Sequence, residues 1–183
     1  ALTRIQPKNG AKFLLTHNYT GYPLIRQARE LIASGALGNI RVVQAEYAQD
    51  WLTNAADPGN KQASWRTDPK RSGAGGAIGD IGTHAYNLLR FVTGLKTEAV
   101  SADLQSFVKG RKVDDNVHIL LRFQGGARGM LWASQVAVGK ENGLQLRIYG
   151  EKAGLEWGQE NPNYMWCTEF GKPRQLLTRG GAI

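Results

Sequence analysis

Apolar residues at every second position are the feature of this sequence that most restricts its fold. They recur in the second half of the chain in four runs, which begin at Val100, Val117, Met130 and Leu144. Such alternation is typical of β-strands with one buried face. Gly125-Gly126 separates two of the runs and 150–154 follows another, so both segments are predicted to be hairpin turns. Because a parallel crossover needs a dozen or more residues, these short connections predict an antiparallel meander.

The first half of the chain carries two helical patterns. Pro23 suits the first turn of a helix, and apolar residues follow it at helical spacing until Ser34-Gly35 ends the pattern. A second helix is predicted to begin at Gly79 and to continue to about Phe91. Both helices come before most of the predicted strands.

Three further segments complete the fold prediction. Phe13-Leu14-Leu15 is a short apolar run that predicts a buried strand, and 40–49 is also strand-like. Residues 50–71 are polar and rich in Asn, Asp and Pro, which predicts a long loop of the kind that often carries function. With helices early and strands late, the expected fold class is α+β: an open, mostly antiparallel β-sheet with helices on one face.

Composition limits the possible classes of function. The chain has 183 residues, of which 42% are hydrophobic, so residues 1–183 are expected to form a single α+β domain. A formal charge of +8 permits an acidic partner, but the basic residues are scattered, and nucleic-acid binding is the weaker alternative. A lone Cys167 excludes an internal disulfide and fits a reducing compartment. Without an apolar run long enough to cross a bilayer, a soluble cytoplasmic protein is expected.

The most specific motif is Gly79-Asp80-Ile81-Gly82-Thr83-His84, which opens the second predicted helix. Residues i and i+4 share one face of an α-helix, so the Asp80 carboxylate and the His84 imidazole are predicted to converge on one small volume. An acid and an imidazole so placed suit proton transfer. The glycine-rich stretch 72–76 precedes this helix and is predicted to let the backbone approach the site.

These residues also have structural explanations. Asp80 could be only a first-turn residue, where a carboxylate is favoured by free backbone N–H groups, and His84 could be a histidine at the edge of the core. For the pair taken alone this explanation is favoured, because short motifs match by chance. His17 is assigned to strand-end packing, and His118 is predicted to face away from the core. Three histidines without close acidic partners do not predict a metal site.

Four motifs in a fixed order reverse that preference. They are 16–19 (THNY) with Pro23, 31–40 (LIASGALGNI), Trp65-Arg66 with 72–76 (SGAGG), and 79–84 (GDIGTH). In this order they resemble the C-terminal domain of the Gfo/Idh/MocA oxidoreductases, the relatives of glucose-fructose oxidoreductase and inositol dehydrogenase. The resemblance covers the chain from about 13 to 157 and implies a domain similar to the C-terminal domain of dihydrodipicolinate reductase.

The resemblance implies a function for the whole enzyme. In that family an N-terminal Rossmann domain binds NAD or NADP, the second domain supplies the substrate pocket, and the open sheet commonly makes the oligomer contact. The chain is therefore expected to be the substrate-binding and oligomerisation domain of a larger, two-domain homo-oligomer. The implied reaction is hydride transfer between the nicotinamide and a carbinol carbon of a sugar, cyclitol or related polyol.

The resemblance also implies roles for individual residues. His84 is the candidate general base, because an unperturbed imidazole titrates at about pH 6.5, and Asp80 orients His84 or accepts a substrate hydroxyl. The residues implied to line the substrate pocket are Asn18, Tyr19, Trp65 and Arg66. Tyr19 and Trp65 could equally well fill the loop without touching substrate. Trp132 and Trp157 are most simply core or interface residues, and Cys167 lacks a histidine partner for nucleophilic chemistry.

The sequence departs from the family pattern in two respects. The dinucleotide fingerprint G-x-G-x-x-G within a βαβ unit is missing, since Ile78 occupies the third glycine position of the similar stretch 73–78. The family's E-K-P element is also missing, neither Lys8 nor Lys12 is assigned its role, and Leu2-Thr3-Arg4 resembles a remnant of the stretch after it. The chain alone is therefore expected to be inactive. The alternative function is a non-catalytic ligand-sensing or oligomerisation module of the same fold.

Overall fold

Strand β1 (Ile40–Ala48) lies in the middle of a single sheet. The computed structural model describes residues 8–57 and 59–180, and within them the other strands are β2 (Thr97–Gln105), β3 (Asn116–Phe123), β4 (Arg128–Ser134), β5 (Gly143–Gly150), β6 (Ala153–Gly158), β7 (Tyr164–Glu169) and β8 (Gln175–Thr178). Their order across the sheet is β2-β3-β4-β1-β5-β6-β7-β8. β1 is parallel to β4 and antiparallel to β5, and the remaining pairs are antiparallel. The predicted open, mostly antiparallel sheet is confirmed.

The continuous meander predicted for the second half of the chain is wrong in one respect. The hairpins at Gly125-Gly126 and at 150–154 are confirmed, because β3 pairs with β4 and β5 with β6. Between β4 and β5, however, β1 is inserted with Ala45 opposite both Leu131 and Leu146. Turn chemistry determines only which consecutive strands pair, and β1 comes from a distant part of the sequence.

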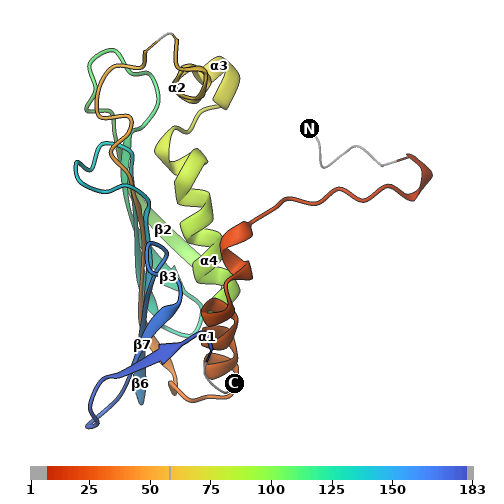
Figure 1. Ribbon diagram of the computed structural model, residues 1–183, viewed down its shortest axis with the longest axis vertical. Coiled ribbons are helices and arrows are strands. Elements are labelled where there is room, and N and C mark those ends of the chain that lie inside the picture. The colour runs from red at the N-terminus through yellow and green to blue at the C-terminus, as the bar shows by residue number, and fades with distance from the viewer. Residues whose placement is uncertain (1–7, 58, 181–183) are drawn as a thin grey trace.

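Two helices cover one face of the sheet, as predicted. They are α1 (Pro23–Ala33) and α4 (Thr83–Thr93), and Figure 1 shows both on the same side of the nearly edge-on sheet. Helix α1 begins with Pro23 in its first turn and ends at Ser34, after which Gly35 has a φ of 76°. The core between helices and sheet is formed by buried side chains that include Leu24, Leu88, Leu89, Val43, Phe123, Leu131 and Ile148.

The long polar stretch predicted to be a loop contains two short helices. They are α2 (Lys61–Arg66) and α3 (Pro69–Ser72). The Asn60 side chain accepts hydrogen bonds from the first turn of α2, and Asp68 does the same for α3, where Pro69 follows directly. Asn, Asp and Pro are typical of loops, whereas here they cap and begin helices. The remaining helical turns are η2 (Lys8–Gly10), η3 (Asn18–Gly21) and η4 (Ile78–Gly82).

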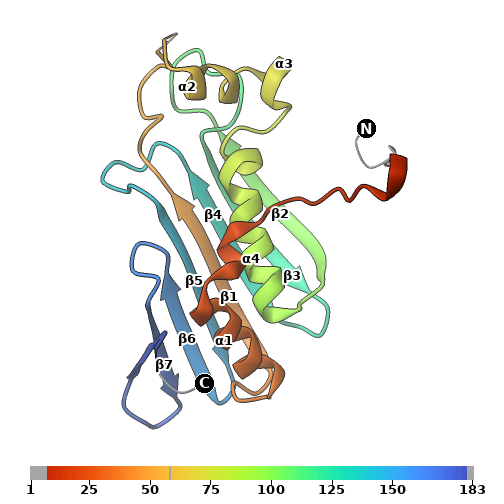
Figure 2. The same ribbon diagram turned by 45° about the vertical axis from the view of Figure 1, so that its right-hand side comes forward.

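The buried strand predicted at Phe13-Leu14-Leu15 is wrong. These residues are extended but belong to no strand of the described chain, and their exposed fractions are 64%, 84% and 75%. Figure 2 shows this segment leading away from the sheet and helices. Apolar character indicates a preference for burial but does not say what provides the cover. The stretch Leu2-Thr3-Arg4 lies outside the described residues.

The predictions for His118 and Trp157 agree with the structure. His118 lies on the exposed face of β3, where its ring stacks on that of Trp132, and Trp157 is 4% exposed in the core. Trp132 lies on the same outer face of the sheet as His118 and is half-buried there, outside the core. Within residues 8–57 and 59–180, no helix has the length and apolar character that crossing a bilayer requires.

Candidate functional site

The helix that carries Asp80 and His84 begins with an irregular turn. Instead of starting as an α-helix at Gly79, the chain forms the π-helix η4, which continues directly into α4. The backbone N–H of Thr83 donates to the carbonyl of Ile78, five residues earlier. Asp80 and His84 nevertheless line the same cavities, as the prediction that they converge on one volume requires. π-turns inside helices are frequent at functional sites.

A buried carboxylate holds the start of this helix. Asp114 Oδ1 accepts from the backbone N–H of Gly76 and Oδ2 from that of Ile78, each at 2.7 Å, while its carbonyl accepts from Ala77 at 2.8 Å. Asp114 is 7% exposed. A Cβ on Gly76 would lie 2.0 Å from the Asp114 carbonyl oxygen, so this close approach requires glycine. The glycine-rich stretch therefore does bring backbone to the site, as predicted.

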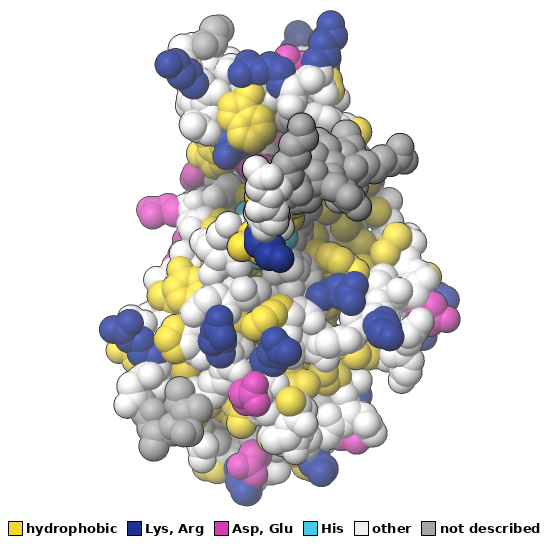
Figure 3. Space-filling view, turned by 90° about the vertical axis from the view of Figure 1, so that its right-hand side faces the viewer, with side chains coloured by type: hydrophobic (Ala, Val, Ile, Leu, Met, Phe, Trp, Pro, Cys, Tyr) yellow, Lys and Arg dark blue, Asp and Glu magenta, His cyan; other side chains and the backbone are white. Residues whose placement is uncertain are grey.

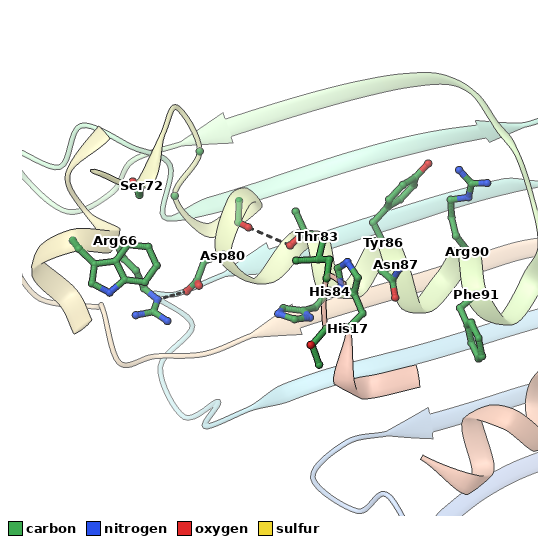
Figure 4. Close-up of a pocket in the computed structure, with 16 residues that line it drawn as sticks. His17, Arg66, Ser72, Asp80, Thr83, His84, Tyr86, Asn87, Arg90 and Phe91 are labelled. Carbon is green, nitrogen blue, oxygen red and sulfur yellow. Dashed lines mark hydrogen bonds and ion pairs between the residues drawn. The ribbon is translucent and has the colours of Figure 1, made fainter. Parts of the chain in front are cut away.

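Asp80 is held by two donors on one of its oxygens. Oδ2 accepts from Arg66 Nε at 2.9 Å and from Gln135 Nε2 at 2.8 Å. Figure 4 shows the Arg66 and Asp80 side chains pointing toward one another. The Arg66 guanidinium also lies 4.3 Å from the centre of the Trp65 ring and donates to the Gln62 carbonyl at 3.3 Å. These contacts fix the carboxylate and leave Oδ1 without a hydrogen bond within the described chain.

His84 is surrounded by aromatic rings. Tyr19 and His17 meet it edge-on with ring centres at 5.2 Å and 5.4 Å, and Tyr47 follows at 6.5 Å. Burial lowers the pKa of His84 below its usual value, a positive charge on His17 lowers it further, and Asp80 opposes both effects. His84 is therefore neutral at pH 7 and can accept a proton.

The Nδ1 atoms of the two histidines share an unusual property. Those of His17 and His84 are buried and have no hydrogen-bond partner within the described part of the chain. In Figure 3, which faces the helix-covered side, a little of the histidine surface is visible. Both imidazoles are half-buried and lie close together in Figure 4, with their ring centres 5.4 Å apart.

Two neighbouring cavities meet at Asp80, His84 and Arg66, which line both. The larger has a volume of about 890 Å³ and is also lined by residues that include His17, Trp65, Gly75, Gly76, Tyr86, Asn87 and Arg90. The smaller has a volume of about 400 Å³ and is also lined by Tyr19, Tyr47, Gln49, Trp51, Gln62 and Ile81. Acid, imidazole and guanidinium groups thus border both cavities.

The structure brings most of the expected site residues together. Trp65 lines the larger cavity and Tyr19 the smaller, next to the groups just described. Asn18 is exposed in η3 and is absent from the described lining of both cavities. His17 was assigned to packing, yet it lines the larger cavity against His84. Its position immediately before the Asn18-Tyr19 turn was the signal that could have identified it.

Several site residues carried no local signal in the sequence. Gln135, Tyr47 and Asp114 come from the end of β4, the end of β1 and the loop before β3. Only the pairing of strands brings them to η4. Among residues 8–57 and 59–180, no three His, Cys, Asp or Glu side chains gather closely enough to hold a metal ion.

Comparisons with known proteins define the family. The family model described as the GFO/IDH/MocA C-terminal domain matches residues 25–156. The chain therefore belongs to the GFO/IDH/MocA family of oxidoreductases, as the four motifs implied.

Three relatives illustrate the similarity. The crystal structure of an oxidoreductase from Sinorhizobium meliloti is 54% identical with a TM-score of 0.80, covering 96% of this chain and 45% of that one. An inositol dehydrogenase homologue from Azotobacter vinelandii, complexed with NADH and myo-inositol, is 35% identical with a TM-score of 0.82, covering 91% and 42%. Levoglucosan dehydrogenase from Pseudarthrobacter phenanthrenivorans is 30% identical over 170 residues, or 80% of this chain and 42% of that protein. The chain spans less than half the length of these relatives.

Replacing Gly76 tests the close approach to Asp114. We expect Gly76→Ala to lower the free energy of unfolding of the chain by about 1 to 3 kcal/mol, because the new methyl group would force the two backbones apart. The matched control is Gly79→Ala, whose Cβ meets nothing within 4 Å and which should change stability by less than about 1 kcal/mol. Urea unfolding measures both. Equal stability of the two variants would contradict the requirement for glycine at this contact.

The protonation of His84 can be followed by NMR titration of its imidazole. We expect a midpoint below the ordinary value of about 6.5, because burial and His17 both disfavour the charged form. His17→Asn should raise the midpoint, since it removes the neighbouring positive charge. The lowered pKa also means that the folded state loses stability as pH falls below about 6.5. A midpoint at or above 6.5, or one unaffected by His17→Asn, would refute this account.

Proposed function

We propose that this chain is the substrate-binding and catalytic half of an NAD(P)-dependent oxidoreductase that acts on a sugar, cyclitol or related polyol. The observation that carries the proposal is that the neutral imidazole of His84 and the anchored carboxylate of Asp80 line the same two cavities. The Azotobacter relative complexed with NADH and myo-inositol supports the same substrate class and cofactor.

The nicotinamide supplies or accepts the hydride when it is bound. We expect most of its contacts to come from a dinucleotide-binding domain outside this chain, as the length of the relatives suggests. Within the chain, Gly75 and Gly76 line the larger cavity. The chain alone should therefore be inactive, because it would lack most of the contacts that bind the cofactor.

The side chains of the site have complementary tasks in the proposed reaction. His84 removes the hydroxyl proton of the carbon that is oxidised, for which its neutral form is required. Asp80 accepts a hydrogen bond from a substrate hydroxyl on its unoccupied Oδ1, and Arg66 holds the other oxygen in place. No lysine is among the described residues that line either cavity, so proton transfer by this chain rests on His84.

The outer face of the sheet is the proposed contact between copies of the chain. Leu120, Met130 and Val42, the outer apolar patch, lie on the adjacent strands β3, β4 and β1 and are 62%, 46% and 37% exposed. Leu120 lies opposite Met130 in the sheet register, and Val42 lies on the next strand, opposite Arg128. Exposed apolar area of this kind favours self-association. The face is opposite to the helices, so the contact would leave the cavities open.

Replacing His84 tests the proposed base. In the full-length protein that contains this chain, His84→Ala should abolish NAD(P)-dependent turnover of a polyol such as myo-inositol without changing the circular dichroism spectrum. The loss should reach about 10²-fold or more, the usual contribution of a positioned proton acceptor. His118→Ala, on the opposite face of the sheet, is the matched control and should remain active. Full activity of His84→Ala would remove the base from the proposal.

A charge placed in the outer apolar patch tests the oligomer contact. Leu120→Glu should convert the full-length oligomer to smaller species in light scattering, because the contact would have to bury a carboxylate. Val138→Glu is the control, since Val138 is 79% exposed and lies outside the patch. Retention of the same mass by Leu120→Glu, or a monomeric wild type, would exclude this contact.

A further inference from the structure

A row of hydrogen bonds leads from Trp51 to the wall of the smaller cavity. It passes through the side chains of Gln49, Asn142 and Tyr47 and ends at the hydroxyl of Tyr19. The five residues come from η3, from β1 and the segment after it, and from the residue before β5. The proposed function uses Tyr19 only as a lining residue and gives the other four no role.

The direction of the row is fixed at Trp51, because an indole N–H can only donate. It donates to Gln49 Oε1 at 3.1 Å, so the Gln49 amide nitrogen is the atom that donates to Asn142 Oδ1 at 3.0 Å. The hydrogen bond made by the other atom of the Asn142 amide supports the same orientation, since Nδ2 donates to Gln159 Oε1 at 3.0 Å. The Asn142 atom that faces Tyr47 is therefore a carbonyl oxygen, which can only accept.

The two phenols must then orient their protons in one way. The Tyr47 hydroxyl lies 2.6 Å from Asn142 Oδ1 and gives its single proton to that oxygen. The hydrogen bond between the hydroxyls of Tyr19 and Tyr47 must consequently be donated by Tyr19. With its only proton committed inside the protein, Tyr19 presents the cavity with an oxygen that can accept but not donate.

We infer that Tyr19 selects a ligand group that donates a hydrogen bond, and that Asn142 and Gln49 are positioning residues that act on this choice through Tyr47. Tyr19 lines the smaller cavity together with Asp80 and His84. A free hydroxyl near the carbon that is oxidised satisfies it, whereas a carbonyl, an ether oxygen or a fluorine at that place leaves its lone pair unpaired. The inference rests on the proposed function and narrows its substrates to polyols with a second, unsubstituted hydroxyl at this position.

Neutron diffraction of deuterium-exchanged crystals of the full-length protein tests the proton directions without any ligand. The expected map places the Tyr47 deuterium toward Asn142 Oδ1 and the Tyr19 deuterium toward the Tyr47 oxygen. A Tyr47 deuterium directed at Tyr19, or a Tyr19 deuterium directed into the cavity, would overturn the inference. This result is independent of whether the protein oxidises a polyol.

Kinetics of the full-length protein with myo-inositol and its deoxy and deoxyfluoro analogues test the selection. At the position that faces Tyr19, both analogues should lose about tenfold in kcat/KM, the equivalent of one hydrogen bond, and should be equally poor because fluorine cannot donate. In Tyr19→Phe, the two analogues should no longer differ from myo-inositol in kcat/KM. A fluorinated analogue clearly better than the deoxy analogue in the wild type would show that Tyr19 donates, and would overturn the inference.

Two variants test the hydrogen-bond relay from Asn142 through Tyr47 to Tyr19: Tyr47→Phe in the wall of the smaller cavity, and Asn142→Leu outside its described lining. In Tyr47→Phe the Tyr19 proton is released toward the cavity, so the deoxyfluoro analogue should become better than the deoxy analogue. Asn142→Leu should have the same effect, because Tyr47 can then donate to Tyr19. If the two residues had only a structural role, the variants would lower activity with all three compounds alike. An unchanged ratio of kcat/KM between the deoxyfluoro and the deoxy analogue in Tyr47→Phe would refute the relay. If the wild type fails to oxidise myo-inositol, the proposed substrate is wrong, and the deuterium positions alone decide the inference.

Discussion

The hydrogen bonds accepted by the Asp114 carboxylate are the interaction on which the rest of the site depends. Both of its oxygens are occupied by backbone N–H groups at the start of η4, and a third bond runs from Ala77 to its carbonyl. Hydrogen bonds to a charged group contribute about 1.5 to 3 kcal/mol each, and a carboxylate this well buried would be costly if they were lost. These hydrogen bonds therefore hold the irregular first turn in place. They tie η4 to the loop before β3, and this places Asp80 beside Gln135.

The surroundings of His84 and Asp80 suit these two ionisable groups to different tasks. His84 is packed among aromatic rings, and the resulting loss of hydration keeps its imidazole neutral. Asp80 is fixed in the same region by hydrogen bonds from Arg66 and Gln135. A neutral base and a fixed carboxylate can therefore coexist at one cavity. Asp80 bonds to Arg66, while His84 remains among the rings.

Local signals in the sequence predicted the parts of the fold that local chemistry determines. Pro23 and Ser34-Gly35 delimit α1, the glycine pairs form hairpins, and the alternating runs are strands. The same level of reasoning failed at Phe13-Leu14-Leu15, where three apolar residues indicated burial without a partner, and at 50–71, where capping residues resembled loop residues. Asp80 and His84 were recognisable because they lie in one motif. The residues that surround Asp80 and His84 were not recognisable, because their positions depend on which strands are neighbours in the sheet.

The insertion of β1 between β4 and β5 explains both the failure and the site. Since β1 and β4 are parallel and β5 is antiparallel, the end of β1, the end of β4 and the start of β5 lie at the same end of the sheet. Gln49, Gln135 and Asn142 consequently meet there, under the first turn of the helix. In the meander predicted from turn lengths, β4 and β5 would be neighbours and Tyr47 could not reach Asn142. One long-range parallel pairing thus assembles the polar end of the sheet, and it leaves the outer face free for the proposed contact between copies.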